Sequence, residues 1–216
     1  MAISKKPNIV LLISDALRPR DLSLYGYNKE TDKNIKKIAS ESLVFCNNFA
    51  ASNASDPSVN SIFTGKYPAN NGIIHQHPNM KDEEIEKLKK NKFWLPLYLQ
   101  RNDYLTISAT PLHMWFKKGF DFYKERDDTK KLLNIPIIKR FLLILPEWAY
   151  SLGKKLVKAR ASPHFYSCKE VIGLAISKIE ESQKPFFLFM HLVDTHCPYP
   201  GSSHNLINGE KTIDKI

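Results

Sequence analysis

The chain has 216 residues, of which 43% are hydrophobic and 25% are charged. This balance suits one globular domain or an incomplete part of a larger one, and no internal repeat or low-complexity segment is present. Lysine and arginine number 32 against 22 acidic residues, so the formal net charge is +10. Such an excess favours anionic partners, namely phosphate or sulfate esters, acidic lipid surfaces or nucleic acid.

Three cysteines, at positions 46, 168 and 197, are too widely spaced for a zinc knuckle or a disulfide framework. They fit a reducing compartment, and we expect a cytoplasmic location. The N-terminal apolar run at 9–13 is shorter than the core of a signal peptide, so we interpret it as a buried strand. Residues 141–153 are too few to span a bilayer and include Pro146 and Glu147.

The first half of the chain predicts two strands and two helices. Residues 8–14 form a continuous apolar run, as central parallel strands do. A helix is expected over 31–42, because Ile35 and Ile38 stand at helical spacing behind a capping residue. Residues 43–50 predict a second strand. Residues 58–64 predict a short helix that Ser55 or Asp56 caps and Gly65 ends.

The second half continues the alternation. Residues 82–102 predict a helix with acidic residues early and basic ones later, which Pro96 divides into two. Strands are expected over 104–110 and 185–194, and a helix over 163–182. Residues 111–162 are the least regular stretch, and we interpret them as a basic, aromatic-rich insertion.

Strands that alternate with helices predict an α/β sandwich with a mainly parallel sheet. Ligands of such sheets collect beyond the carboxyl ends of the strands. Asp15, Asp194 and His196 directly follow predicted strands, and Ser55 lies shortly past another. These four side chains are therefore the candidate site.

Each candidate has a structural and a functional interpretation. Asp15 is either a helix cap or a ligand for a hard divalent cation. Ser55 is either a cap or a nucleophile that attacks phosphorus or sulfur, because a helix N-terminus also holds anions. His196 is either a surface-loop residue or a general acid on a leaving oxygen.

Taken together, the segments resemble the sulfatase family of the alkaline phosphatase superfamily. The resemblance rests on "PNIVLLISDALRP", "DKNIKKIASESLVFCNNFA", "SDPSVNSIFTGKYPANNGI", "FWLPLYLQRNDYLTISAT", "KKGFDFY" and "FFLFMHLVDTHCPYP", in that order. They cover nearly the whole chain. The most specific match is the spacing of Ser55, Pro57, Ser58, Thr64 and Gly65 to the family signature Cys/Ser-x-Pro-Ser-Arg-x-x-Leu-x-Thr-Gly.

The resemblance implies an alkaline phosphatase-like three-layer sandwich, with residues 1–216 as an incomplete N-terminal part of it. It implies that Asp15 and Ser55 bind a divalent metal and that Ser55 occupies the nucleophile position. Ser58, with Asp194, would support the site, and His196 would contact the leaving group. Calcium is the metal expected for sulfate esters, whereas manganese or zinc suits phosphate esters.

The sequence departs from the family pattern at three places. Ala16 stands where many members have a second aspartate, and Val59 replaces the signature arginine. Because the enzyme that modifies the nucleophile reads that arginine, Val59 argues against formylglycine at Ser55. An unmodified serine favours phosphate chemistry, since water can release a phosphoserine. The second metal-binding segment of the family is not found in the chain, so a complementing C-terminal chain is one expected partner.

Two other functions stay open. One is a non-catalytic remnant or binding module that keeps the fold. The other is a basic surface protein: nucleic acid is not expected, because no nucleic-acid-binding motif is found. Membrane-surface contact is favoured by the mixture of apolar, aromatic and basic residues at 135–161, although a lid packed on the domain explains the same pattern.

Overall fold

The computed structural model describes residues 6–110, 114–124 and 168–196, and every structural statement below concerns these residues. The strands are β1 (Ile9–Ser14), β2 (Leu105–Ala109), β3 (Phe122–Lys124) and β4 (Phe186–Leu192). The α-helices are α1 (Lys33–Ala39), α2 (Ser55–Thr64), α3 (Pro68–Asn71), α4 (Asp82–Lys90), α5 (Leu95–Arg101) and α9 (Cys168–Glu180). Three short 3-10 helices are η1 (Pro19–Asp21), η2 (Ser23–Tyr25) and η3 (Met114–Lys117).

The described strands form one parallel sheet in the order β1-β4-β2-β3. The predicted strands over 8–14, 104–110 and 185–194 are confirmed, and β4 lies between β1 and β2. The prediction that 8–14 is a central strand is wrong within this sheet, because β1 pairs on one side only. β3 was not predicted; it falls in the segment interpreted as an insertion, of which only 114–124 is described.

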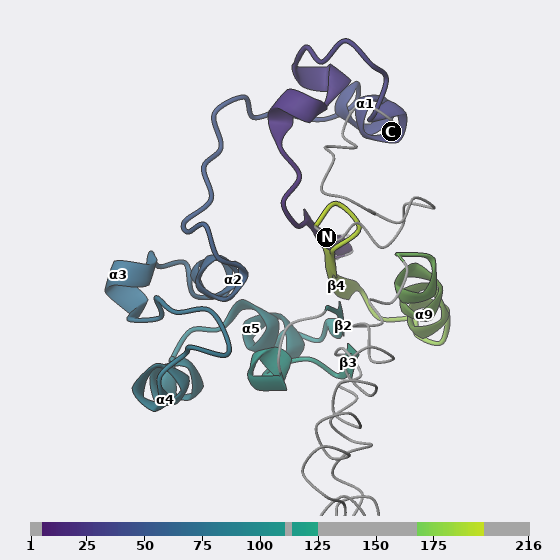
Figure 1. The fold of residues 1–216 in the computed structure, drawn as a ribbon. Helices are drawn as coiled ribbons and strands as arrows, with labels where there is room; N and C mark the ends of the chain where they lie inside the picture. Colours follow the sequence, from purple (N-terminus) through teal and green to yellow (C-terminus); the bar gives the residue numbers. More distant parts are fainter. Residues whose placement is uncertain (1–5, 111–113, 125–167, 197–216) are drawn as a thin grey trace, which may run out of the picture.

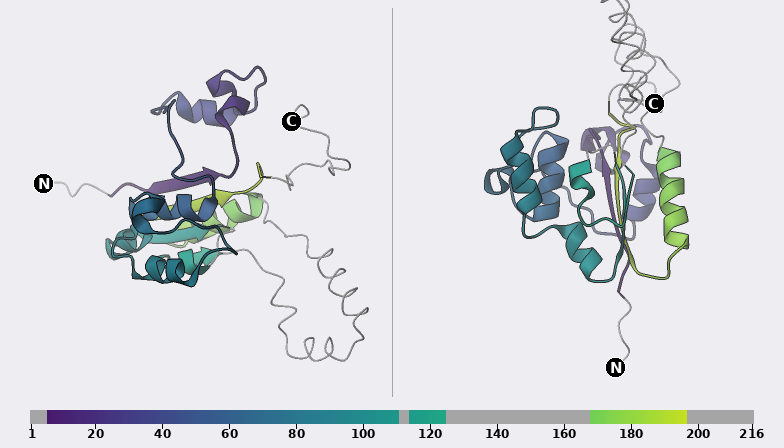
Figure 2. Two further views of the ribbon diagram at one scale, coloured as in Figure 1. Left: turned by 60° about the vertical axis from the view of Figure 1, so that its left-hand side comes forward. Right: turned by 90° about the horizontal axis from the view of Figure 1, so that it is seen from below.

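Helices cover both faces of the sheet, as a three-layer sandwich requires (Figure 2). Helices α2, α4 and α5 pack on one face, where the larger core joins them to β1 and β4 through Val59, Phe63, Leu88, Trp94, Leu99, Phe187 and Phe189. Helix α9 covers the other face, where Ala175 meets Ile107, Leu188 and Met190. Side chains of β4 therefore alternate between the two cores, as a buried parallel strand demands.

The predicted helices form with small differences in their ends. Helix α4 has three acidic residues in its first turn and three lysines in its last, which matches the helix dipole. Residues 91–94 separate α4 from α5, and Pro96 lies in the first turn of α5, where its missing N–H costs nothing. Helix α9 confirms the helix predicted over 163–182 in its described part. None of the described helices is long and apolar enough to cross a membrane.

The strand predicted over 43–50 is wrong. These residues have no regular structure, and Leu43, Phe45 and Phe49 are 72–87% exposed. They belong to the segment from β1 to α2, which also carries α1. Figures 1 and 2 place α1 on the side of β1 that is opposite to β4. No described strand pairs with residues 43–50. They therefore do not form a strand, although apolar and β-branched residues favour one.

Candidate active site

The carboxyl ends of β1 and β4 are joined by direct contacts of the backbone and of hydroxyl groups. The N–H of Asp15 donates to the carbonyl of Leu192 at 2.8 Å, so pairing continues one residue past β1. The Thr195 hydroxyl donates to the Asp15 carbonyl at 2.6 Å and lies 2.9 Å from the Ser14 hydroxyl. These contacts fix the backbone of Asp15 against the turn that carries Asp194 and His196.

Ser55 reaches this edge from the N-terminus of α2. Its hydroxyl donates to Asp15 Oδ2 at 3.3 Å, although 40 positions separate the two residues. The prediction that Ser55 caps the helix is wrong: Ala54 is the cap residue and Ser55 is the first residue of α2. Gln76 Oε1 accepts the N–H of Asp56 at 2.7 Å instead. The Ser55 hydroxyl is thus directed at a carboxylate, and Gln76 accepts a free N–H of the first helical turn in its place.

His191 is the residue of this cluster that the sequence did not reveal. It lies near the end of β4 and is 5% exposed, with Nε2 3.3 Å from Asp15 Oδ2. Its Nδ1 is buried and has no hydrogen-bond partner among the described residues. Because side chains alternate along a strand, His191 shares a face with Phe187 and Phe189, which is the face that α2 covers. That parity with two core phenylalanines is the signal that a sequence could have provided.

The surroundings of Asp15 favour its carboxylate form. The side-chain hydrogen bond from His191 is the main cause that lowers the pKa of Asp15, and partial burial opposes it. The charges of His191 and His196 and the Ser55 hydroxyl lower the pKa further. Asp15 is therefore an ionised carboxylate at the end of a strand, and a carboxylate is the form that a hard cation binds.

The other predicted site residues are Asp194, His196 and Ser58. Asp194 and His196 are in the turn directly after β4, and the His196 N–H donates to the carbonyl of Val193 at 2.9 Å. Ser58 does not point to Asp15; its hydroxyl donates to the carbonyl of Ser52 at 2.8 Å. Ser58 therefore ties the loop before α2 to the first turn of that helix.

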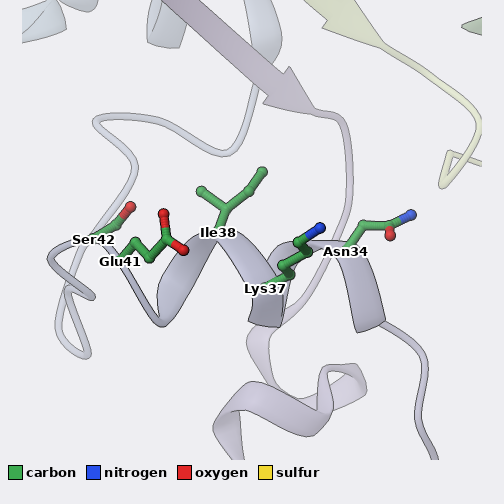
Figure 3. A pocket seen from close by; sticks show the side chains of 5 residues that line it. All are labelled: Asn34, Lys37, Ile38, Glu41 and Ser42. Atoms are coloured by element: carbon green, nitrogen blue, oxygen red, sulfur yellow. The ribbon is translucent and has the colours of Figure 1, made fainter.

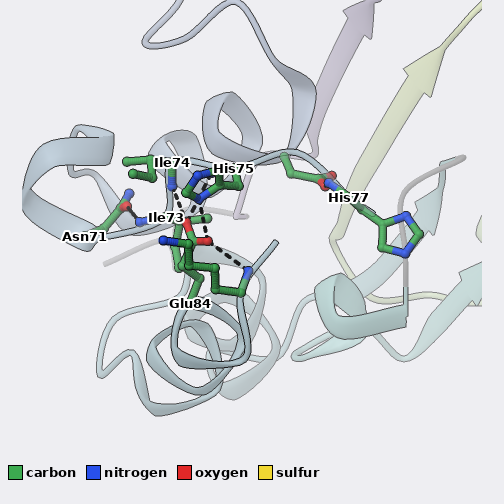
Figure 4. A network of polar contacts seen from close by, with 8 residues as sticks. Asn71, Ile73, Ile74, His75, His77 and Glu84 are labelled. Carbon is green, nitrogen blue, oxygen red and sulfur yellow. Dashed lines mark hydrogen bonds and ion pairs between the residues drawn. The ribbon is translucent and has the colours of Figure 1, made fainter. Parts of the chain in front are cut away.

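The first turn of α2 is held in place by residues 73–77, which Glu84 anchors (Figure 4). Glu84 is buried and accepts the N–H groups of Ile74, His75 and Lys81 and the His75 ring. Burial raises its pKa, but these donors outweigh that effect and lower the pKa to about 2. At the other end of the segment, the His77 N–H donates to Asp56 at 2.8 Å.

Val59, at the position of the signature arginine, is 1% exposed and belongs to the larger core. It packs with Phe63 and other apolar residues and has no polar atom to offer Ser55. The Ser55 hydroxyl is therefore contacted by Asp15, and position 59 brings no positive charge to it.

The donor set for a metal is partial. Asp15 and Ser55 supply two adjacent oxygen atoms, but no three His, Cys, Asp or Glu residues gather into a metal-binding group in the described part of the chain. A hollow of about 440 Å³ lies elsewhere, on α1 and the turn after it (Figure 3). Its lining residues, Asn34, Lys37, Ile38, Glu41 and Ser42, include none of the predicted site residues.

The structure is thus an α/β sandwich with a parallel sheet between helical layers, and a carboxylate and a hydroxyl meet at the carboxyl ends of its strands. A family model described as Sulfatase matches residues 7–207, so the chain belongs to the sulfatase family. It is 24% identical over 212 residues to human N-acetylgalactosamine-6-sulfatase, covering 89% of this chain and 40% of that protein. Over 82 residues it is 34% identical to an ulvan-active sulfatase of Formosa agariphila, covering 38% of this chain and 16% of that protein.

Solved structures share the same fold. BT4656, bound to its substrate D-glucosamine-2-N,6-O-disulfate, gives a TM-score of 0.62 at 20% identity, covering 89% of this chain and 35% of that one. The phosphonate monoester hydrolase of Agrobacterium radiobacter gives 0.58 at 18% identity, covering 89% of this chain and 42% of that one. The chain therefore spans less than half the length of each of these relatives.

Proposed function

We propose that the chain carries the nucleophile half of a metal-dependent centre that hydrolyses phosphate or sulfate esters. The observation that carries this proposal is the 3.3 Å contact between Ser55 and Asp15, which brings together a hydroxyl and an ionised carboxylate from distant parts of the sequence. Both lie at the carboxyl edge of a parallel sheet, where ligands of such folds bind. The net charge of +10 suits an anionic ester.

Each residue has a defined task in this proposal. Asp15 and Ser55 would supply oxygen ligands to a divalent cation, which when bound lowers the pKa of a coordinated hydroxyl. The Ser55 oxygen attacks phosphorus, its proton leaves to solvent, and the bond to the leaving oxygen breaks as His196 protonates that oxygen. Water then attacks the phosphorus of the serine ester, which releases phosphate and restores Ser55.

We favour phosphate or phosphonate esters over sulfate esters for an unmodified Ser55. Val59 is buried in the core and leaves Ser55 without the arginine of the family signature. A serine sulfate lacks the aldehyde hydrate that expels sulfate in the formylglycine scheme, whereas a serine phosphate is open to water at phosphorus. Calcium is the cation expected for the sulfate branch, and manganese or zinc for the phosphate branch.

The ligands beyond Asp15 and Ser55 would come from a complementing C-terminal polypeptide. This part of the proposal is supported by the partial donor set and by relatives more than twice as long. The coding sequence after codon 216 tests it. We expect a segment in which a strand runs into Asp-His-Gly or Asp-Asn-Gly, either in frame or in the next gene. If neither position encodes such a segment, the proposal that a C-terminal polypeptide supplies the remaining metal ligands is refuted.

The experiment on the nucleophile compares the chain with its Ser55→Ala variant, each produced with that C-terminal segment. We expect 4-nitrophenyl phosphate and phenylphosphonate esters to be hydrolysed faster than 4-nitrophenyl sulfate, and the variant to lose at least about 100-fold in rate. Ser61→Ala is the control, because its hydroxyl lies in the same helix and only donates to the carbonyl of Pro57. Equal rates in Ser55→Ala and the parent would refute the assignment of the nucleophile.

Mass spectrometry of the peptide that holds Ser55 separates the two branches. An intact serine supports phosphate chemistry. A loss of about 2 Da marks oxidation of the alcohol to formylglycine and would favour sulfate esters.

A non-catalytic binding module of the same fold is the second candidate. It is favoured by the absence of a three-residue acidic or histidine cluster from the described part of the chain. It predicts that the ester assays stay at the background rate whether or not Ser55 is replaced.

A further inference from the structure

His191 is a polar residue in a position that the fold otherwise fills with apolar side chains. Along β4, Phe187 and Phe189 precede it on the same face and are fully buried in the larger core. An imidazole in that row must lose its hydration, and a buried ring nitrogen without a partner is not compensated for that loss. His191 has one such nitrogen, Nδ1, among the described residues.

The other ring nitrogen makes a specific contact. Nε2 lies 3.3 Å from Asp15 Oδ2, the same oxygen that accepts the Ser55 hydroxyl at 3.3 Å. The backbone of Asp15 is fixed by Leu192 and Thr195, but those bonds do not determine the rotation of its carboxylate. His191 approaches the carboxylate from β4, and Ser55 approaches it from α2.

We propose that His191 is a positioning residue for Asp15: its Nε2–H donates to Oδ2 and fixes the carboxylate in the orientation that meets Ser55. This inference rests on the proposed function, because it assigns the orientation of Asp15 a role in holding a cation. Groups that orient metal ligands typically change metal affinity 10–100-fold when they are removed. Within the described part of the chain Nδ1 has no hydrogen-bond partner, so the imidazole occupies this position despite the loss of its hydration.

A set of substitutions separates this role from a structural one. His191→Phe keeps an aromatic ring and removes both ring nitrogens. His191→Gln keeps a donor near the position of Nε2. Ser177→Ala is the control, because its hydroxyl donates to the carbonyl of Leu174 within α9, on the other face of the sheet. A purely structural histidine predicts that stability and function change together in His191→Phe.

The first measurement is the ring N–H proton of His191 in the metal-free protein, observed by 15N-edited NMR at neutral pH. We expect a slowly exchanging, downfield Nε2–H signal that is lost or shifted upfield in Asp15→Ala. A proton on Nδ1 with a bare Nε2, or an Nε2–H signal unchanged in Asp15→Ala, would overturn the proposal. This measurement needs no catalysis, so its result is separate from that of the hydrolysis assays.

The second measurement is the affinity for Mn²⁺ of the chain supplied with the C-terminal segment, followed by paramagnetic broadening of the amide signals near Asp15. We expect His191→Phe to weaken binding at least about tenfold while its melting temperature is unchanged or higher, and His191→Gln to stay within about threefold of the parent. Equal affinity in His191→Phe and the parent would overturn the positioning role. If the parent shows no broadening, the cation in the proposed function is refuted, and the Nε2–H signal alone decides for His191.

Discussion

At the scale of single residues, the site depends on which side chains share one carboxylate oxygen. Asp15 and Ser55 were predictable because one directly follows an apolar run and the other stands beside Pro57 before a helix. The only sequence signal for His191 is its parity with Phe187 and Phe189, and that signal can be used only when the two faces of β4 are assigned. The cap of α2 was predicted wrongly, since Gln76 is 20 positions away from Asp56 and no local pattern connects them.

Ser58 supports the loop before α2, and its removal tests that task. We expect Ser58→Ala to cost about 1 kcal/mol of unfolding free energy, because the carbonyl of Ser52 loses its donor. Amide hydrogen exchange at residues 52–55 should become faster. Ser61→Ala removes a similar bond inside the helix and should leave exchange at 52–55 unchanged. If both variants showed the same exchange at residues 52–55, the Ser58 hydrogen bond would not be what stabilises this loop.

At the scale of elements, α2 is positioned by the segment that runs from Ile73 to His77. Glu84 of α4 anchors the first part of this segment (Figure 4). Gln76 and His77 bind Asp56 in the first turn of α2. The placement of the Ser55 hydroxyl therefore depends on a carboxylate in a different helix. Neither the sequence spacing nor the family signature of α2 includes Glu84.

Glu84→Gln should destabilise the protein by about 3 kcal/mol at neutral pH, because an amide cannot accept all the hydrogen bonds of the carboxylate. The folded-state pKa of Glu84 is about 2, below its ordinary 4.5, so this stabilisation is complete above pH 4.5. It is lost as the pH falls from 4.5 towards 2. Urea unfolding of both proteins at pH 7 and at about pH 3 measures the effect.

The matched control is Glu86→Gln, since Glu86 is half exposed on the same helix and pairs only with Lys89 and Lys90 among the described residues. It should leave the free energy of unfolding close to that of the parent at both pH values, because solvent screens an exposed ion pair. A Glu84→Gln difference that stays constant between pH 7 and pH 3 would contradict the assignment of the low pKa.

Most elements were predictable because their signals are local. The apolar runs of β1, β2 and β4 and the spacing in α1, α4 and α9 require no knowledge of the partner elements. Residues 43–50 failed for the opposite reason: a strand needs a neighbour, and none of the described strands lies against them. β3 is three residues long, which is too short for a periodic pattern.

At the scale of the whole molecule, β1 is an edge strand among the described residues, and an apolar surface beside it is exposed. Residues 9, 11 and 13 of β1 pack against the larger core, so Val10 and Leu12 face the other side, where they are more than half exposed. Helix α9 covers β2 and β4 on that side. Together with the exposed apolar residues of 35–49, this surface fits the complementing polypeptide of the proposed function.

Two neighbouring leucines of β1 test this surface. Leu12→Lys should change the free energy of unfolding by less than about 0.5 kcal/mol and reduce ANS fluorescence, because Leu12 is exposed in the chain alone. Leu11→Lys should cost about 3 kcal/mol or more, since Leu11 packs against the core. When the C-terminal segment is supplied, Leu12→Lys should block its binding. A Leu12→Lys protein that binds the segment as the parent does would place the interface elsewhere.

The central claim is that Asp15 and Ser55 form a cation-binding, reactive edge of the sheet. Titration with Mn²⁺ of the 15N-labelled chain supplied with the C-terminal segment tests it most directly, with the parent protein compared with Asp15→Asn. We predict selective broadening of the amide signals of Asp15, Ser55 and residues 194–196 in the parent, and its loss in Asp15→Asn. Broadening that is absent from these residues, or equal in the two proteins, would contradict the account.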